Sequence, residues 1–212
     1  ECQELVANPR DRLPLTEMSD KISSICVFCG SQSGTKPEYE AAARHVGRSL
    51  AERNIRLVYG GGSVGLMGAV ANACLEAGGE VIGVITTYLM DKELGHPGIT
   101  KLEVVNTMLD RKLRMAELSD AFLTLPGGIG TLDELFEMLT WSRLNVHDKP
   151  SGLINVEGYY DELISFALKT QVEGGFISAE DALNLLVAES FEDLLPKLEL
   201  ATQSPPSSRF AT

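Results

Sequence analysis

Short runs of apolar and β-branched residues alternate along this chain with longer stretches of helix-like periodicity. Such alternation is typical of a parallel sheet wrapped by helices. The apolar runs are nearly continuous, as expected for strands that are covered on both faces. They predict strands at residues 24–29, 56–59, 81–85, 102–105, 121–125, 152–155 and 185–187, and the intervening patterns predict helices at 37–53, 64–77, 109–118, 131–144, 159–172 and 191–198.

These elements predict an α/β fold, namely a doubly wound, Rossmann-like and mostly parallel sheet with helices on both faces. No internal repeat and no second domain boundary interrupts the pattern, so we expect a single domain over residues 21–200. The polar stretch 1–20 and the Ser- and Pro-containing stretch 201–212 have compositions that gain little from packing, and we expect both to be flexible tails.

Composition narrows the classes of partner. The 212 residues are 44% hydrophobic and carry a formal charge of −12, the wrong sign for binding polymeric phosphate or an acidic membrane. No run approaches the roughly 20 apolar residues of a membrane span. The first twenty residues lack the pattern of a signal peptide. We therefore expect a cytoplasmic protein, although a chain that opens with Glu1 leaves an upstream targeting sequence open.

Four cysteines are too few for a disulfide-stapled fold. Cys26 and Cys29 form a C-x-x-C pair, which raises the alternative of a metal or redox site. A zinc site would need a second ligand pair, and the predicted strand 24–29 would point the two thiols to opposite faces. We expect buried structural thiols and no metal.

Three predicted strands run into glycine-rich turns that open helices: Cys29-Gly-Ser31, Tyr59-Gly-Gly-Gly-Ser-Val-Gly-Leu-Met-Gly68 and Pro126-Gly-Gly-Ile-Gly-Thr131. In a doubly wound sheet these turns share the carboxyl edge, where glycine backbone and helix N-termini favour a phosphate. The alternative is that the glycines merely permit tight turns. From the first two turns, the candidates for phosphate or ribose contacts are Gly30, Ser31, Gly61, Gly62, Gly65 and Met67.

The second turn also matches G-x-G-x-x-G through Gly60, Gly62 and Gly65. A dinucleotide site needs an acidic residue at the end of the next strand, and residues 81–87 offer none. A nicotinamide-dependent oxidoreductase is therefore disfavoured. A Walker A loop is excluded because Gly-Lys occurs nowhere in the chain.

The third turn places Thr131 at a helix entry and Glu134 one turn later, where a carboxylate could face a ligand. The same spacing also fits a capping box that only satisfies the helix N-terminus. Arg111 and Lys112 follow another strand, and their alternative role is a solvated basic face supported by an Asp110–Arg114 pair.

Together these motifs resemble the LOG (LONELY GUY) family of cytokinin riboside 5′-monophosphate phosphoribohydrolases. The resemblance rests on Phe28-Cys-Gly-Ser31, the second turn, Arg111-Lys112 and above all Pro126-Gly-Gly-Ile-Gly-Thr-Leu-Asp-Glu134. It continues through Trp141, residues 147–150, residues 158–160 and residues 175–178, and spans roughly residues 22–198. Relatives have often been labelled lysine decarboxylases, but no feature of the sequence argues for a pyridoxal phosphate enzyme.

The resemblance implies hydrolysis of the N-glycosidic bond of cytokinin ribotides, and of AMP in some relatives, without a cofactor or metal. It assigns Arg111 and Glu134 as the catalytic pair. It assigns as substrate contacts Glu93, Lys112, Gly128, Ile129, Gly130, Thr131, Leu132, Asp133 and Thr140. The family usually has His where this chain has Leu109, so base preference can differ. A nucleotide-binding or carrier module that does not hydrolyse its ligand is the main alternative.

The predicted helix 131–144 is apolar on two sides: Leu132, Leu135, Phe136 and Leu139 form one stripe, and Met138, Trp141 and Leu144 form another. We expect one side to meet the sheet and the other a second subunit, which predicts a homodimer through this helix. The alternative is a long loop over the second stripe. His147 lies beside Asp148 but lacks a nucleophile in a suitable turn, so we expect it to be structural.

Overall fold

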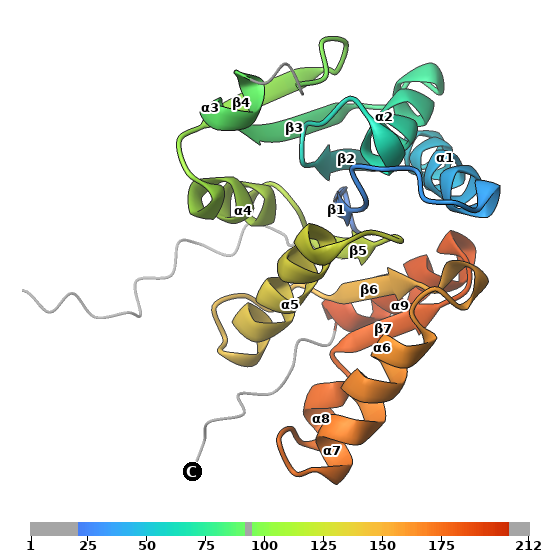
Figure 1. The fold of residues 1–212 in the computed structure, drawn as a ribbon, viewed down its shortest axis with the longest axis vertical. Helices are drawn as coiled ribbons and strands as arrows, with labels where there is room; N and C mark the ends of the chain where they lie inside the picture. The colour runs from blue at the N-terminus through green and yellow to red at the C-terminus, as the bar shows by residue number, and fades with distance from the viewer. Residues whose placement is uncertain (1–20, 92–94, 204–212) are drawn as a thin grey trace, which may run out of the picture.

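The predicted strands form one parallel sheet in the order β4-β3-β2-β1-β5-β6-β7 (Figure 1). The structure is a computed structural model that describes residues 21–91 and 95–203. The doubly wound α/β prediction is confirmed, because the chain winds outward from β1 to β4 and then returns to place β5 on the other side of β1. The strands are β1 (Ser24–Phe28), β2 (Arg56–Tyr59), β3 (Val81–Thr86), β4 (Lys101–Val105), β5 (Ala121–Thr124), β6 (Ser151–Ile154) and β7 (Leu185–Ala188).

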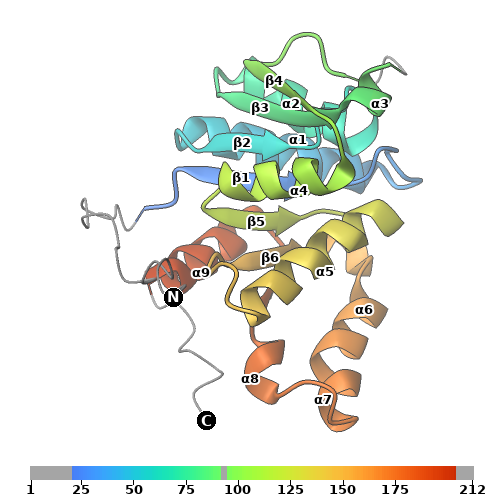
Figure 2. The same ribbon diagram turned by 90° about the vertical axis from the view of Figure 1, so that its left-hand side faces the viewer.

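Helices cover both faces of the sheet, as Figure 2 shows. One face carries α1 (Pro37–Glu52), α2 (Gly65–Glu76) and α9 (Phe191–Gln203). The opposite face carries α4 (Met108–Glu117) and α5 (Ile129–Arg143). The shorter elements are α3 (Thr87–Met90), the 3-10 turn η1 (Val156–Gly158), α6 (Asp161–Ser165), the π-helical turn η2 (Phe166–Thr170), α7 (Gln171–Glu173) and α8 (Ala179–Ala182).

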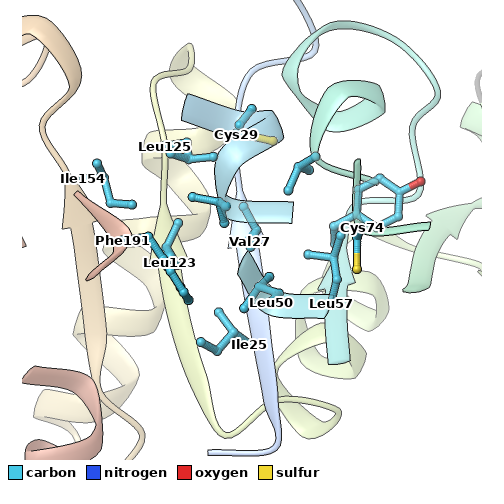
Figure 3. Packing of buried hydrophobic residues seen from close by; sticks show 14 of the residues in the cluster. Ile25, Val27, Cys29, Leu50, Leu57, Cys74, Leu123, Leu125, Ile154 and Phe191 are labelled. Atoms are coloured by element: carbon cyan, nitrogen blue, oxygen red, sulfur yellow. The ribbon is translucent and has the colours of Figure 1, made fainter. Parts of the chain in front are cut away.

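The packing of the central strand β1 explains why its sequence is apolar from Ile25 to Phe28. Ile25 and Val27 pack into the cluster beneath α1 and α2, which Figure 3 shows from close by. Cys26 and Phe28 point the other way, into the cluster beneath α4 and α5. Since successive residues of a strand face opposite sides, a strand that is buried on both faces carries apolar side chains at nearly every position.

The same alternation places the two thiols of the C-x-x-C pair on opposite faces of the sheet, as predicted. Cys29 lies in the cluster on the α1 and α2 side and Cys26 in the cluster on the other side, and both are buried free thiols. Burial raises the pKa of each thiol, so neither is a ready thiolate.

The predicted helix 159–172 begins later than its periodicity suggests. The Asn155 side chain accepts a hydrogen bond from the backbone N–H of Tyr160 at 2.8 Å and donates one to Asp161 at 2.7 Å. Glu157 and Gly158 have positive φ angles, so this turn is closed before α6 begins at Asp161.

The carboxyl-terminal boundary is also corrected, because α9 continues to Gln203 and so includes the first residues of the predicted tail 201–212. The predicted tail 1–20 and residues 204–212 lie outside the described residues. Among the helices that the structure describes, none has both the length and the apolar character needed to cross a lipid bilayer.

Candidate active site

The three glycine-rich turns meet at the carboxyl edge of the sheet, where the strand order reverses between β1 and β5. The backbone N–H of Gly30 donates to Pro126 O at 3.0 Å, and the backbone N–H of Leu66 donates to Gly30 O at 3.0 Å. Gly65 has φ +61°, and a Cβ there would lie 2.3 Å from the carbonyl carbon of Ser31. Glycine at this position therefore allows the start of α2 to approach the first turn.

A cavity of about 410 Å³ opens over this junction. Such a crevice at the switch point of a doubly wound sheet is where ligands usually bind. Its walls come from all three turns and from helices α4 and α5. They are formed by Cys29, Ser31, Gly60, Gly62, Val64, Met67, Ile85, Leu89, Arg111, Gly128, Ile129, Gly130, Thr131 and Glu134.

Arg111 lies at the base of this cavity with its side chain only 7% exposed. Helix α4 begins with a capping box in which Thr107 and Asp110 satisfy each other's backbone, and this turns Arg111 toward the sheet. Its guanidinium donates to Val84 O at 2.9 Å, to Gly60 O at 3.3 Å and to Glu134 Oε1 at 2.9 Å. A Cβ at Gly60 would lie 2.0 Å from the Arg111 Nη2 atom, so only glycine leaves room for this guanidinium.

Glu134 lies inside α5 rather than at its cap. The helix begins at Ile129 with Gly128 as its N-cap, and Gly128 makes no side-chain cap. The capping-box alternative for Thr131 and Glu134 is therefore wrong, because the helix starts two residues earlier than the spacing suggested. The Glu134 carboxylate, 11% exposed, pairs with Arg111 instead.

Burial raises the pKa of Glu134 above its ordinary value, and the charge and hydrogen bond of Arg111 oppose that rise. A carboxylate in such a place is poorly hydrated, so it interacts strongly with any positive charge that develops beside it. The cavity therefore holds an anion and a cation that are both largely desolvated and lie 2.9 Å apart.

The start of α5 offers a place for an anion on the same cavity. Gly128, Ile129 and Gly130 are exposed, and a Cβ built on Gly128 or Gly130 meets no atom within 4 Å. The first amide groups of a helix have no partner within the helix and carry its positive dipole end. A phosphate could approach these amides closely.

The structure brings together most of the residues that the motifs singled out. Nine of them line the 410 Å³ cavity: Ser31, Gly62, Met67, Arg111, Gly128, Ile129, Gly130, Thr131 and Glu134. Gly30 lines a neighbouring cavity of about 370 Å³, which shares Ser31 and Gly128 with the first. Gly61 and Gly65 act in packing, since a Cβ at Gly61 would crowd Leu102 and Ile85. Glu93 lies outside the described residues.

Other expected substrate contacts lie on the outer surface of α5. Leu132, Asp133 and Thr140 line a shallow surface hollow there, and the Thr140 hydroxyl donates to Phe136 O at 2.7 Å. Lys112 pairs with Asp133 at 3.1 Å and Glu137 at 2.8 Å. Among the described residues of this chain, none of these four lines the 410 Å³ cavity.

The alternative of a solvated basic face around Arg111 is also wrong. Arg111 is buried, Asp110 bonds to Thr107, and Arg114 pairs with Glu103 at 2.7 Å and Glu117 at 3.0 Å. Leu109 is 61% exposed on the first turn of α4 and does not line the cavity.

Sequence reasoning missed several walls of the cavity. Gly60, Val64 and Cys29 belong to glycine-rich turns that the sequence did identify, although they were not among the expected ligand contacts. Ile85 lies near the end of β3, and Leu89 lies on the short helix α3, which periodicity could not predict. Leu89 had no signal in the sequence, because a four-residue helix spans barely one turn and cannot show a repeating pattern.

His147 lies away from the cavity, in the packing between α5 and the sheet. Its ring contacts Phe122 and Trp141 with centroid distances of 5.3 and 6.5 Å, and its Nδ1 accepts the backbone N–H of Lys149. Burial lowers its pKa to about 4. These contacts agree with the structural role that we expected.

Fold and cavity together define a Rossmann-like α/β protein with a cavity at its topological switch point. A family model described as "Possible lysine decarboxylase" matches residues 67–198. The protein named cytokinin riboside 5′-monophosphate phosphoribohydrolase LOG1 of Arabidopsis thaliana is 50% identical over 183 residues, which cover 86% of this chain and 85% of that one. LOG3 of the same plant, named likewise, is 48% identical and covers 91% and 88%. The chain therefore belongs to the LOG family, to which the resemblance pointed.

Solved structures with this fold are more distant in sequence. The molybdenum cofactor carrier protein of Chlamydomonas reinhardtii has a TM-score of 0.66 at 18% identity, covering 87% of this chain and all of that one. The molybdenum cofactor binding protein of Rippkaea orientalis has a TM-score of 0.64 at 20% identity, covering 85% and 97%. At this identity the likeness concerns the fold alone.

The family description raises the question of pyridoxal phosphate, which enzymes hold through a lysine Schiff base. No lysine is among the described residues that line the cavity, and Lys112 beside it is engaged by two carboxylates. The residues present do not fit that cofactor.

Proposed function

We propose that this protein hydrolyses the N-glycosidic bond of cytokinin riboside 5′-monophosphates, with AMP as a second substrate, and releases free base and ribose 5-phosphate. The observation that carries the proposal is the buried Arg111–Glu134 pair at the base of the cavity, beside the open N-terminus of α5. Relatives about 50% identical over most of their length bear the name of this activity.

The reaction requires a site that stabilises a cationic sugar. When the bond from C1′ to the base nitrogen breaks, its electron pair leaves with the base and positive charge develops on the ribose. A fixed carboxylate beside C1′ stabilises this charge more in the transition state than in the ground state, and that difference is what accelerates a reaction. Glu134 is the carboxylate that lines this cavity among the described residues.

Water completes the reaction by adding its oxygen to C1′, while its proton ends on the released base. Glu134 can serve this step in two ways. It can orient the ribose hydroxyls and the attacking water, or it can form a transient ester with C1′ that water then cleaves. Both routes use the same carboxylate in the same place.

The other cavity residues bind the substrate. The amides of Gly128, Gly130 and Thr131 would hold the 5′-phosphate at the start of α5. Arg111 keeps Glu134 in place and supplies positive charge to the phosphate or to the leaving base. Val64, Met67 and Ile85 give the cavity apolar walls, against which a flat base can pack.

A chromatographic assay for released base tests this function directly. Wild-type protein is offered isopentenyladenosine 5′-monophosphate, AMP and the two matching nucleosides. We expect release from the monophosphates only, because the start of α5 binds the phosphate. Binding of AMP without release of base from any compound would instead support the non-hydrolytic carrier. A higher melting temperature of the protein in the presence of NAD or NADP would instead support a nicotinamide-dependent oxidoreductase.

We also propose a homodimer through the outer surfaces of α5 and α4. The structure corrects how α5 would contribute: Leu135 and Met138 are both buried within the chain, and Trp141 packs on the cluster around Phe122. The second stripe is therefore only partly covered by the chain's own residues, since Leu144 is 57% exposed. A further exposed surface lies around Phe136 and Thr140, together with Met108, Leu109 and Leu113 of α4.

On this surface Thr140 could reach a substrate only in the other subunit. Light scattering at micromolar concentration should give twice the chain mass. A monomeric mass would contradict the dimer and leave Thr140 without a substrate to contact.

A further inference from the structure

His96 is a buried side chain that connects three segments behind the cavity. It lies between α3 and β4 and is 8% exposed. Its backbone N–H donates to Gly61 O at 2.9 Å, and the preceding Gly95 forms an antiparallel bridge with Gly62. The segment that carries His96 is thus attached to the second glycine-rich turn.

The imidazole ring makes two further hydrogen bonds, one from each nitrogen. The backbone N–H of Gly98 donates to Nδ1 at 3.1 Å. Since Nδ1 is an acceptor, the proton of the neutral ring lies on Nε2, which donates to the Asn72 Oδ1 atom at 3.0 Å. Burial lowers the pKa of His96, which favours this neutral form. Asn72 lies on α2, so the ring connects the turn segment to that helix.

Both segments that the ring connects form walls of the cavity. Gly60 and Gly62 line it from the turn, and Met67 lines it from the first turns of α2. The Gly60 carbonyl also accepts a hydrogen bond from Arg111, which in turn holds Glu134. A shift of the turn relative to α2 would therefore change the position of the Arg111 guanidinium.

We propose that His96 is a positioning residue: its bond to Asn72 fixes the 60–62 turn against α2, so that the Gly60 carbonyl keeps Arg111 directed at Glu134. His96 does not line the cavity, so it acts through the turn and not on the substrate. The proposal rests on the hydrolysis proposed above. Small displacements of a catalytic pair lower the rate of the chemical step more than they weaken binding.

Two substitutions of His96 test the hydrogen bonds of its two ring nitrogen atoms separately. His96→Asn keeps an acceptor for the Gly98 N–H, since asparagine commonly bonds to the backbone two residues on, but it is too short to reach Asn72. His96→Gln keeps a donor at the position of Nε2. Asn72→Ala removes the acceptor on α2 with a residue that favours helix. His45→Asn is the matched control, since His45 is half exposed and pairs with Glu192.

Base release and amide hydrogen exchange are measured for each variant. We expect His96→Asn and Asn72→Ala each to lower kcat about tenfold with KM changed less than about twofold. We expect His96→Gln to recover to within about threefold of wild type, and His45→Asn to match wild type. In His96→Asn and Asn72→Ala, peptides covering residues 57–67 should exchange faster.

Other results would overturn the proposal. Faster exchange with unchanged kcat would make His96 a purely structural residue. Unchanged exchange would show that the His96–Asn72 hydrogen bond does not hold the 60–62 turn against α2. If His96→Asn does not fold, Asn72→Ala decides the question alone. No base release by wild-type protein would overturn the proposed hydrolysis together with this role, whereas equal release by wild type, His96→Asn and Asn72→Ala would overturn only the role of His96.

Discussion

Two neighbouring ion-pair groups link the same two helices, yet only one of them lines the cavity. Arg111 of α4 pairs with Glu134 of α5, and their side chains are 7% and 11% exposed. The next residue on α4, Lys112, is 13% exposed and pairs with Asp133 and Glu137 of α5, which are 57% and 21% exposed. The first pair lines the cavity, and the second group lies on the outer side of the helices.

One step along a helix rotates a side chain by about 100°, and here that rotation separates the pair at the cavity from a group on the outer side of the helices. Asp133 is more than half exposed, so water screens its contact with Lys112, and this contact contributes little free energy. The Arg111–Glu134 pair lacks that screening, and its charges act strongly on whatever occupies the cavity. Adjacent charged residues in a motif can therefore have unrelated roles, and their position relative to the cavity predicts which substitutions abolish activity.

The largest effect is expected for Glu134→Gln. Glutamine keeps an oxygen that accepts from Arg111, so the protein should fold, but it removes the charge that stabilises the cationic sugar. We expect kcat to fall about a thousandfold. Glu137→Gln is the matched control, since it makes the same change one turn further along α5 at a residue that does not line the cavity, and its kcat should stay within about threefold of wild type. Equal losses in both variants would contradict the comparison.

Arg111→Lys should come next, with kcat lowered about a hundredfold. The ammonium group of lysine cannot donate to Val84 O, Gly60 O and Glu134 with the geometry of a guanidinium. Carbonyls left buried without donors should also lower the free energy of unfolding by about 2 kcal/mol, measured by urea denaturation. Activity close to wild type would mean that the charge matters and the three-way geometry does not.

The pH dependence of kcat/KM gives a smaller but specific effect. Burial raises the pKa of Glu134 above 4.5, so activity that needs its carboxylate should fall as the pH drops through that raised value. Arg114 and then Lys101 hold the pKa of Glu103 down to about 2, so the stability that Glu103 contributes is present above pH 4.5 and is lost between 4.5 and about 2. Activity should thus fall before this contribution to folding is lost. An acid limb that coincides with unfolding by circular dichroism would contradict this order.

Lys112→Met should have the smallest effect, since it removes only an ion-pair group that does not line the cavity. We expect kcat/KM to change less than about threefold and the free energy of unfolding to fall by less than about 1 kcal/mol. A loss as large as that of Arg111→Lys would show that Lys112 contacts the substrate, as the family resemblance implies.

Much of the fold was accessible from sequence because the central strands are buried on both faces. The predicted strand 24–29 and the strand β1 differ by a single residue, since its apolar run has no polar interruption. The start of α6 was placed too early, because the Asn155 side chain closes a turn that periodicity does not report. Short helices such as α3 carry too few residues to show a period.

The site was predictable at the level of turns and less so at the level of side chains. The three turns were expected at one edge, and Arg111 and Glu134 do meet there. The direction of a side chain depends on where its helix begins: α5 begins at Ile129 and not at Thr131, so Glu134 belongs to the cavity and not to a cap. Lys112 shares a motif with Arg111, and Thr140 lies on the same helix as Glu134, but neither residue lines the cavity, and no spacing could distinguish them.

Binding and turnover measured on one sample of Glu134→Gln test most directly whether the buried pair performs the chemistry. AMP is titrated into the variant by calorimetry, and the contents of the cell are then separated by chromatography. We predict an affinity within about tenfold of the wild-type value and AMP recovered intact, since the phosphate is held at the start of α5 and only the charge beside the sugar is gone. Free adenine formed at the wild-type rate would contradict the central role of Glu134.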